Sequence, residues 1–413
     1  MRKKLLAGVM ALALCSTNMP PQTIFAGEFT SGNLEEVTEE TPEIFSDDNQ
    51  EVIEETEEEL SVFSSENVPE FSSEVNIMSA TADETEPIGI DMNDITNLNY
   101  YDSSKGIWKI TSAGSYRFNG TGNNDAPILI DHIDSGTVKV YLNNVNIHSA
   151  DRTPPLRITN TVHADVYIYL ESSNLLQSTY INSAALQIDG TTKLIIDNSP
   201  GTNGSLTANS SKHGTGIGSS GNSDLSPAFH IIIKGGAVTA SSFRSMGIGG
   251  NNSNITIDGG SVKASSRTHF GIKSSSLTIN GGSVTASSEE EPKEDISSNQ
   301  IIINGGSVKA SSVSSSPTND HGEKVYCCTI ENLNSKKVII DQNLKPWEPN
   351  NHQAVNPTDT NLYAWLTGED HIVNVGTERR SYIFDSEDSE SGTFSNTKRN
   401  ATSDIFEFNG PRN

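Results

Sequence analysis

The stretch GGSVKASS at residues 259–266 decides the fold, because the chain repeats it at nearly even intervals. GGAVTASS stands at 235–242, GGSVTASS at 281–288, and GGSVKASS again at 305–312. The first glycines of these stretches are 24, 22 and 24 residues apart. A period of this length is typical of a solenoid, in which no repeat can bury its apolar face alone and stacked neighbours share one core.

Alternation inside the repeat separates an apolar face from a polar one. Successive side chains of a strand point to opposite faces, so Val262 and Ala264 share one face while Lys263 lies on the other. With coils stacked about 4.8 Å apart, equivalent residues form columns that we expect to fill a narrow interior. The columns are Val238, Val262, Val284, Val308; Ala240, Ala264, Ala286, Ala310; Ile233, Ile257, Ile279, Ile303; and Ile217, Ile248, Ile272, Ile296.

A glycine pair opens each repeat and permits a sharp turn where a Cβ would clash. The residues just before the pairs form a further column, Lys234, Asp258, Asn280 and Asn304. Two asparagines at matched positions predict a short ladder of side-chain amides along the turns.

The same pattern runs backward with longer loops. APILI (126–130), PPLRI (154–158) and AALQI (184–188) correspond to one another, and VKVYL (138–142) corresponds to VYIYL (166–170). No helical periodicity of useful length interrupts these strand-like pieces. The sequence therefore predicts an all-β protein, a right-handed parallel β-helix of about eight coils.

The ends of the predicted solenoid differ from its middle. GIWKITSAGSYRFNGTG and the residues after it (106–125) are expected to cap the N-terminal end. YCCTI (326–330) and KKVII (336–340) resemble a degenerate last coil. We assign the β-helix to residues 95–345, and a small C-terminal cap with a strand-rich appendage to 346–413.

The first 26 residues read as a secretory signal peptide. The basic MRKK precedes the short apolar run LLAGVMALALC, and Ala26 suits cleavage. A lipid attached at Cys15 is the alternative. We therefore expect a secreted, extracellular protein of a bacterial cell. The adjacent Cys327 and Cys328 are expected to face opposite sides of a strand, with a strained vicinal disulfide as the alternative.

Residues 27–94 carry most of the chain's excess negative charge. They contain 22 of the 53 acidic residues and no Lys or Arg, in a chain of formal charge −26. Such a segment cannot bury enough apolar surface to offset the entropy of ordering. We read it as a disordered acidic linker. Strong acidity also argues against nucleic-acid binding, which needs a basic surface.

Few residues of the predicted coils carry reactive chemistry, since no nucleophile motif, paired histidines or phosphate loop is found. Asp131, Asp134 and Asp165, with Asp151, gather in the early loops and could hold calcium. Ordinary solvated turn aspartates are the alternative. The parallel coil architecture also hosts polysaccharide lyases, which need acids that hold calcium and an Arg or Lys base.

A pair of aligned tyrosines is the clearest binding feature. The inward residues of VKVYL and VYIYL leave Tyr141 and Tyr169 outward on neighbouring coils, with Tyr167 beside them over Lys139. Exposed aromatic rows suit the apolar faces of sugars. Strand tyrosines covered by a loop are the alternative interpretation.

The run ITSAGSYRFNGTG…APILI…VKVYLNNVNIHSA…PPLRITN…ADVYIYLESSNLL, followed by the GIG…GGxVxA units, resembles a clostridial group of secreted parallel β-helix proteins. They are described as carbohydrate-binding domain-containing proteins, and the resemblance covers roughly residues 106–312. It implies binding of plant-type polysaccharides such as cellulose or pectic chains, and calcium sites along the coil. The acid-poor loops of this chain depart from that expectation of calcium.

Taken together, these patterns favour a secreted, monomeric, non-enzymatic β-helix that binds polysaccharide at or near the bacterial surface. The predicted ligand residues are Tyr141, Tyr167, Tyr169 and Lys139, and the cofactor candidate is calcium. A polysaccharide lyase and an adhesin that binds host surface proteins are the alternatives. No nucleic acid and no membrane-spanning segment are expected.

Overall fold

The computed structural model describes the chain from residue 86 onward with several gaps. The predicted signal peptide (1–26) and most of the acidic segment (27–94) lie outside the described residues. The part that is described holds no helix with the length and hydropathy that a bilayer crossing needs. The described ranges are 86–221, 227–290, 294–331, 333, 336, 338–340, 360–386 and 392–397.

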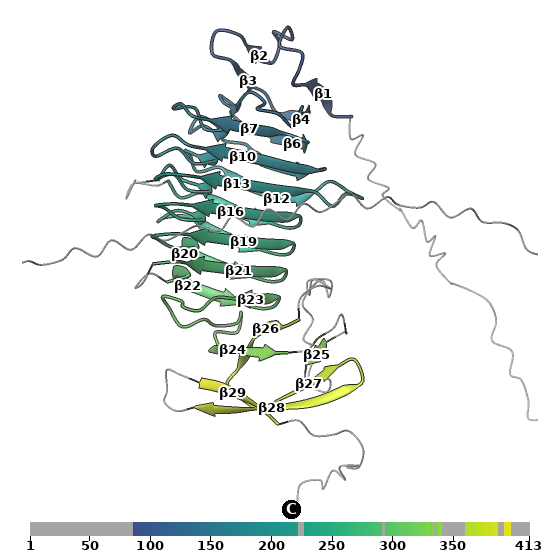
Figure 1. The fold of residues 1–413 in the computed structure, drawn as a ribbon, viewed down its shortest axis with the longest axis vertical. Helices are drawn as coiled ribbons and strands as arrows, with labels where there is room; N and C mark the ends of the chain where they lie inside the picture. Colours follow the sequence, from purple (N-terminus) through teal and green to yellow (C-terminus); the bar gives the residue numbers. More distant parts are fainter. Residues whose placement is uncertain are drawn as a thin grey trace, which may run out of the picture. The chain divides into compact units, whose positions relative to one another are not determined.

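Parallel strands stacked coil upon coil make up the main body, and within the described ranges every element is a strand or an irregular connection (Figure 1). The solenoid has about eight turns, which confirms the predicted fold class. Its first face consists of β4 (Gly114–Asn119), β6 (Thr137–Asn143), β9 (Asp165–Leu170), β12 (Lys193–Asn198), β15 (His230–Ile233), β18 (Asn254–Ile257), β20 (Ile272–Ile279) and β22 (Ile296–Ile303).

A second face joins the first through the long strand β20, so that both belong to one 16-stranded sheet. A separate seven-stranded sheet forms the third face. The second face contains β3 (Ile107–Ile110), β5 (Ile128–Ile130), β8 (Leu156–Ile158), β11 (Leu186–Ile188), β14 (Ile217–Gly218) and β17 (Ile248–Gly249). The third contains β7 (Asn146–Ser149), β10 (Ser173–Ser178), β13 (Ser205–Ser210), β16 (Ala237–Ser242), β19 (Ser261–Ser266), β21 (Ser283–Ser288) and β23 (Ser307–Lys309).

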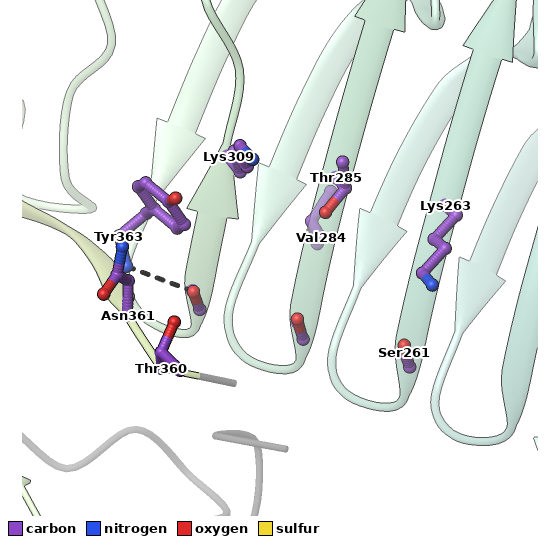
Figure 2. A pocket seen from close by; sticks show the side chains of 10 residues that line it. Ser261, Lys263, Val284, Thr285, Lys309, Thr360, Asn361 and Tyr363 are labelled. Atoms are coloured by element: carbon purple, nitrogen blue, oxygen red, sulfur yellow. Dashed lines mark hydrogen bonds between the residues drawn. The ribbon is translucent and has the colours of Figure 1, made fainter. Parts of the chain in front are cut away.

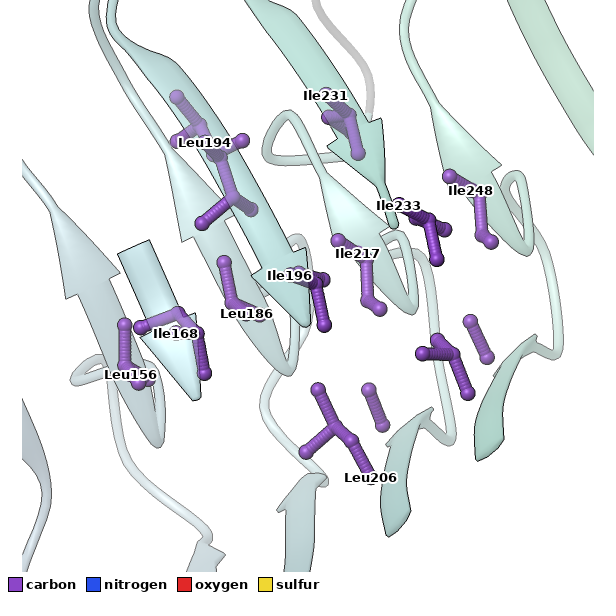
Figure 3. Close-up of a cluster of buried hydrophobic side chains, with 14 of the residues drawn as sticks. Leu156, Ile168, Leu186, Leu194, Ile196, Leu206, Ile217, Ile231, Ile233 and Ile248 are labelled. Atoms are coloured by element: carbon purple, nitrogen blue, oxygen red, sulfur yellow. The ribbon is translucent and has the colours of Figure 1, made fainter. Parts of the chain in front are cut away.

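The core columns form as the repeat predicts. Ile257 pairs with Ile279 and Ile279 with Ile303, in parallel register. Val262 pairs with Val238 and with Val284 on the third face. Aliphatic side chains from opposing strands meet inside the coils (Figure 3). These isoleucines and valines are buried, which removes the apolar surface of each coil from water. Ala310, the last member of the predicted alanine column, follows β23 and is only partly buried.

The turns of the repeat also match the sequence. The second glycine of each pair has a positive φ, 78° at Gly260 and 82° at Gly282. A Cβ built on Gly260 would lie 2.6 Å from the carbonyl oxygen of Gly236, so the turns stack too closely for a side chain. The predicted amide ladder is present, since Asn304 donates to Asn280 Oδ1 at 2.9 Å and Asn280 donates to Asp258 Oδ1 at 2.8 Å.

The N-terminal end differs from the expectation that residues 106–125 form a cap. β3 pairs with β5 and β4 with β6, both parallel and in register, so this segment forms the first coil. Another parallel strand, β1 (Ile88–Asp91), adds to β4. It begins inside the range 27–94 assigned above to the acidic linker. The short β2 (Tyr101–Asp102) pairs antiparallel with β3.

The prediction of a degenerate last coil at 326–340 is wrong. β24 (Val325–Ile330) pairs antiparallel with β26 (Leu362–Thr367), and β25 (Val338–Ile340) pairs antiparallel with β27 (His371–Val375). The alternation of apolar residues does not distinguish parallel from antiparallel strands. Here the partner strands, β26 and β27, come later in the chain. The second antiparallel sheet is completed by β28 (Glu378–Ser386) and β29 (Gly392–Thr397). Cys328 is buried and Cys327 exposed, both free thiols on opposite sides of β24, as predicted.

Candidate functional site

The candidate site, called here the tyrosine face, lies on the outward side of β4, β6, β9 and β12. Parallel pairing sets Tyr141 opposite Tyr169 and Lys139 opposite Tyr167. The alternate residues of these strands, such as Val140 and Ile168, are fully buried. Burial of the alternate residues places the three tyrosines outside the core, on the side that the sequence analysis assigned to them.

The tyrosine rings stack on one another. The ring centroids of Tyr141 and Tyr169 are 4.8 Å apart with planes inclined by 21°. Tyr167 lies nearly parallel to Tyr169, with centroids 6.0 Å apart and planes inclined by 15°. The Arg117 guanidinium carbon is 5.4 Å from the centre of the Tyr141 ring. Since Arg117 and Tyr169 are its register neighbours on opposite strands, Tyr141 is covered on both faces.

Stacking changes how this surface can contact a sugar. An isolated exposed tyrosine offers its ring face for apolar contact with a pyranose. Here the faces of Tyr141 are already occupied, so the accessible parts are ring edges and phenolic oxygens. The surface is therefore better suited to hydrogen bonds and edge contacts along a chain of sugar rings than to stacking on one flat ring.

The protonation state of the Tyr169 hydroxyl favours hydrogen bonding to sugars. Burial raises the pKa of the Tyr169 hydroxyl, and although Lys139 lowers it, the neighbouring Tyr141, Tyr167 and Asp197 raise it further. The hydroxyl therefore stays protonated in neutral and mildly alkaline solution. It can act as both donor and acceptor, as the hydroxyl groups of a sugar require.

Charged groups border the rings on either side. Arg117 Nη2 lies 3.1 Å from Glu171 Oε1, and Ser199 Oγ donates to the same oxygen at 3.3 Å. Asp197 is the register neighbour of Tyr169 on β12. The tyrosine face thus combines aromatic edges with fixed donors and acceptors, the mixture that orients a polar ligand.

Of the aspartates expected as calcium ligands, Asp131, Asp151 and Asp165 bind partners within the protein. Asp165 Oδ2 is 3.3 Å from Lys193 Nζ. Asp151 accepts a hydrogen bond from Thr153 N at 2.8 Å, which closes its own turn. Asp134 is exposed. Among the described residues, no three His, Cys, Asp or Glu side chains gather into a metal-binding group. Calcium binding stays a prediction.

Asp131 is the most strongly held of these carboxylates. Its Oδ2 lies 2.7 Å from His132 Nδ1 and 3.3 Å from Lys109 Nζ. Its Oδ1 accepts hydrogen bonds from the Thr159 and Thr161 hydroxyls at 2.8 and 2.9 Å. Partial burial raises the pKa of this carboxyl, but the hydrogen bonds outweigh burial and hold the pKa well below its ordinary value. Asp131 therefore joins neighbouring coils through its own protein partners.

Sequence reasoning missed Arg117 and Glu171. Arg117 is the register partner of Tyr141, and Glu171 follows Tyr169 by two residues. The step of 28 residues between Tyr141 and Tyr169, taken back from Tyr141, reaches Ala113, whereas Arg117 precedes Tyr141 by 24 residues. The repeat step alone therefore does not place Arg117 beside Tyr141. Its ion pair with Glu171, which bridges over β6 to β9, depends on side-chain conformation.

Comparison with known proteins adds one family. A family model described as "Carbohydrate-binding domain-containing protein" matches residues 104–192. No curated protein and no solved structure matches the chain. The matched segment contains every residue of the tyrosine face up to Glu171. The family match and the β-helix fold together support carbohydrate binding.

Proposed function

We propose that this protein is a secreted, non-enzymatic, monomeric β-helix that binds polysaccharide through the tyrosine face. The observation that carries the proposal is the in-register stack of Tyr141 and Tyr169, 4.8 Å apart, inside the segment matched by the carbohydrate-binding family. Secretion is inferred from the basic and apolar N-terminal sequence alone. An extracellular location would bring the tyrosine face to glycans at or near the bacterial surface.

The coil axis offers a natural direction for a polysaccharide. Residues at equivalent positions recur about every 4.8 Å along the stack, so Arg117, Tyr141, Tyr169 and Asp197 form one row across four strands. A chain lying along this row would meet hydrogen-bonding groups at each step. Several weak contacts of this kind add up only for a polymer, which predicts that affinity rises with the number of sugar units.

Binding to a panel of soluble and insoluble polysaccharides tests the proposal. The double variant Tyr141→Ala, Tyr169→Ala is expected to weaken retention at least tenfold, because each tyrosine supplies both edge area and a hydroxyl. The double variant Tyr141→Phe, Tyr169→Phe keeps the stack and removes only the hydroxyls. It is expected to lose most of the binding if hydrogen bonds at the ring edges dominate.

Thermal melting of each variant separates lost binding from lost folding. His148→Ala is a matched control, because His148 is an exposed outward residue of β7, on another face. Retention unchanged in the alanine double variant, with the fold intact, would contradict the proposed site. Failure of the wild-type protein to bind any polysaccharide of the panel would contradict the proposed function.

A polysaccharide lyase is the enzymatic alternative. Incubation with polygalacturonate and calcium, followed by ultraviolet absorbance, detects the unsaturated product of such a reaction. We expect a flat trace. A steady rise that scales with protein concentration would assign the chain to the lyases instead.

A protein-binding adhesin is the remaining alternative. It predicts capture of host surface proteins that soluble glycans do not displace. We expect soluble polysaccharide to compete with any host surface that the protein binds.

A further inference from the structure

A second site lies on the third face of the solenoid, far along the chain from the tyrosine face. Its floor is built by three consecutive strands, β19, β21 and β23, mainly through their outward residues (Figure 2). Its wall is built by residues at the start of β26. The pocket between them has a volume of about 380 Å³, within the usual range for small-ligand sites. It is lined by Ser261, Lys263, Ser283, Val284, Thr285, Ser307, Lys309, Thr360, Asn361 and Tyr363.

Two hydrogen bonds hold the wall against the floor. Tyr363 N donates to Ser307 Oγ at 3.1 Å, the dashed line of Figure 2. Trp365 Nε1 donates to the backbone carbonyl of Val308 at 3.0 Å. Both acceptors belong to β23, the last strand of its sheet. The C-terminal segment therefore covers the open sheet edge and, in doing so, fixes the pocket before any ligand arrives.

The pocket is positively charged. Lys263 and Lys309 lie in the same outward row on either side of Thr285. No Asp or Glu is among the described residues that line the pocket. Among the residues that the structure describes, neither lysine forms an ion pair. Lys309 Nζ lies 5.5 Å from the centre of the Tyr363 ring, a cation–π arrangement that holds the ammonium near the wall.

The remaining lining groups select among anions. Hydroxyls of Ser261, Ser283, Thr285 and Thr360 and the amide of Asn361 can each bond to hydroxyl groups of a ligand. Tyr363 adds an aromatic surface for a sugar ring. An anionic group on the ligand would supply the negative charge that Lys263 and Lys309 lack among the described lining residues. A sugar that carries an acidic group is the class of molecule that uses all of these at once.

We propose that this pocket binds an acidic oligosaccharide, with its carboxylate or sulfate group held by Lys263 and Lys309 and a sugar ring against Tyr363. The site lies outside the segment matched by the family model and shares no residue with the tyrosine face. The inference goes beyond the proposed function, and each can fail without the other. A protein with both sites could hold two different glycans, or two stretches of one branched glycan.

Calorimetric titration of the full chain at low salt tests the site. The probes are trigalacturonate, which carries carboxylates, a sulfated galactose oligosaccharide, and neutral galactotriose. We expect at least one acidic probe to bind and the neutral probe to bind at least tenfold more weakly. Raising the salt concentration should weaken binding of the acidic probe, because the two lysines are exposed to solvent and salt screens their charge.

Variants assign the binding to the pocket. Lys263→Gln and Lys309→Gln are each expected to lower the affinity for the acidic probe about tenfold. This is the loss expected when a hydrogen bond to a charged group is removed. Lys234→Gln is the matched control, since it removes the same charge from an exposed turn position, between β15 and β16, that does not line the pocket. Tyr363→Phe should leave affinity within about twofold, and Tyr363→Ala should weaken it.

The double variant Tyr141→Ala, Tyr169→Ala separates the two sites and should bind the acidic probe as the wild type does. If only that variant lost binding of the acidic probe, the acidic probe would bind at the tyrosine face and the proposal would be overturned. Three other results would also overturn it. They are no binding of either acidic probe, equal binding of neutral galactotriose, and an equal loss with Lys234→Gln.

Discussion

The early coils and the late repeats of this solenoid bury the same kind of core but present different outer surfaces. In the early coils, ion pairs link adjacent coils at Lys109–Asp131, Arg157–Asp189 and Lys193–Asp165, and Arg117–Glu171 reaches across one intervening coil. In the late repeats, amides and hydroxyls link the coils, as at Asn280–Asn304 and Ser274–Ser298. The interior specifies the fold, so the outer positions are free to differ between regions and to carry binding.

If both regions share one core, the same deletion should cost the same in each. Ile168→Ala in an early coil and Ile279→Ala in a late repeat each remove a fully buried side chain. We expect each to lower the free energy of unfolding by about 2–5 kcal/mol, the range for such cavities. Denaturant unfolding followed by circular dichroism measures both. Thr278→Ala, which changes an outward neighbour of Ile279, should cost less than about 1 kcal/mol.

A near-neutral result for one isoleucine alone would break the comparison. It would show that one region unfolds separately and contributes little to the stability of the other, which repeat proteins can do. A melting curve in two steps would be the accompanying sign.

The turns provide a second comparison between the regions. Gly260 in a late repeat and Gly201 in an early coil have nearly the same φ, 78° and 77°. A Cβ on Gly260 would meet the Gly236 carbonyl oxygen at 2.6 Å, whereas a Cβ on Gly201 has no atom within 4 Å. Gly201→Ala should therefore cost about 1 kcal/mol, for the left-handed backbone alone. Gly260→Ala should cost about 2–4 kcal/mol, because the stacked turn must also move.

Thermal and denaturant unfolding of the two glycine variants side by side measure the difference. Equal costs would mean that backbone conformation, rather than close stacking of turns, explains the glycine pair. A larger cost for Gly201→Ala would contradict the proposed role of stacking altogether.

Most of the solenoid could be predicted from the sequence because its pairing partners recur at a fixed step. The columns through Ile257 and Val262, the Asn280–Asn304 ladder and the outward position of Tyr141 all follow from period and alternation. The antiparallel pairing of β24 could not be predicted this way. Its partner, β26, is a non-repeating segment, and no periodicity relates the two strands.

Each of the two candidate sites also has one part that the repeat predicts and another part that depends on long-range packing. The row from Tyr141 through Tyr169 to Asp197 follows from the step of 28 residues. The place of Arg117, 24 residues before Tyr141, does not follow from that step, and the covered faces of Tyr141 depend on where the Arg117 side chain lies. The lysine pocket needs a floor from the repeats and a wall from β26, which follows β23 by about fifty residues. The outward lysines were visible in the sequence. Their enclosure by Tyr363 depends on long-range packing that a single strand pattern does not encode.

The ion-paired early coils should respond to acid through Asp131. The folded-state pKa of this carboxyl is depressed below its ordinary value of about 3.9. The folded state therefore binds fewer protons than the unfolded chain at mildly acid pH. Its contribution to stability is complete above about pH 5 and declines as the pH falls through 3.9 toward the folded value. The effect on the free energy of unfolding should be smaller than that of either core variant or of Gly260→Ala.

Asp131→Asn removes that contribution while it keeps the size of the side chain. We expect the variant to be about 1–2 kcal/mol less stable at pH 7, because the bonds from Lys109, His132 and the two threonines lose their charged acceptor. Between pH 5 and pH 3 the variant should lose less stability than the wild type, so their denaturation midpoints converge. Asp134→Asn removes the same charge from an exposed position of the same loop and should leave both midpoints unchanged. If the denaturation midpoints of the wild type and Asp131→Asn change in parallel with pH, the cluster around Asp131 does not stabilise the early coils. The early coils and the late repeats would then differ in surface composition alone.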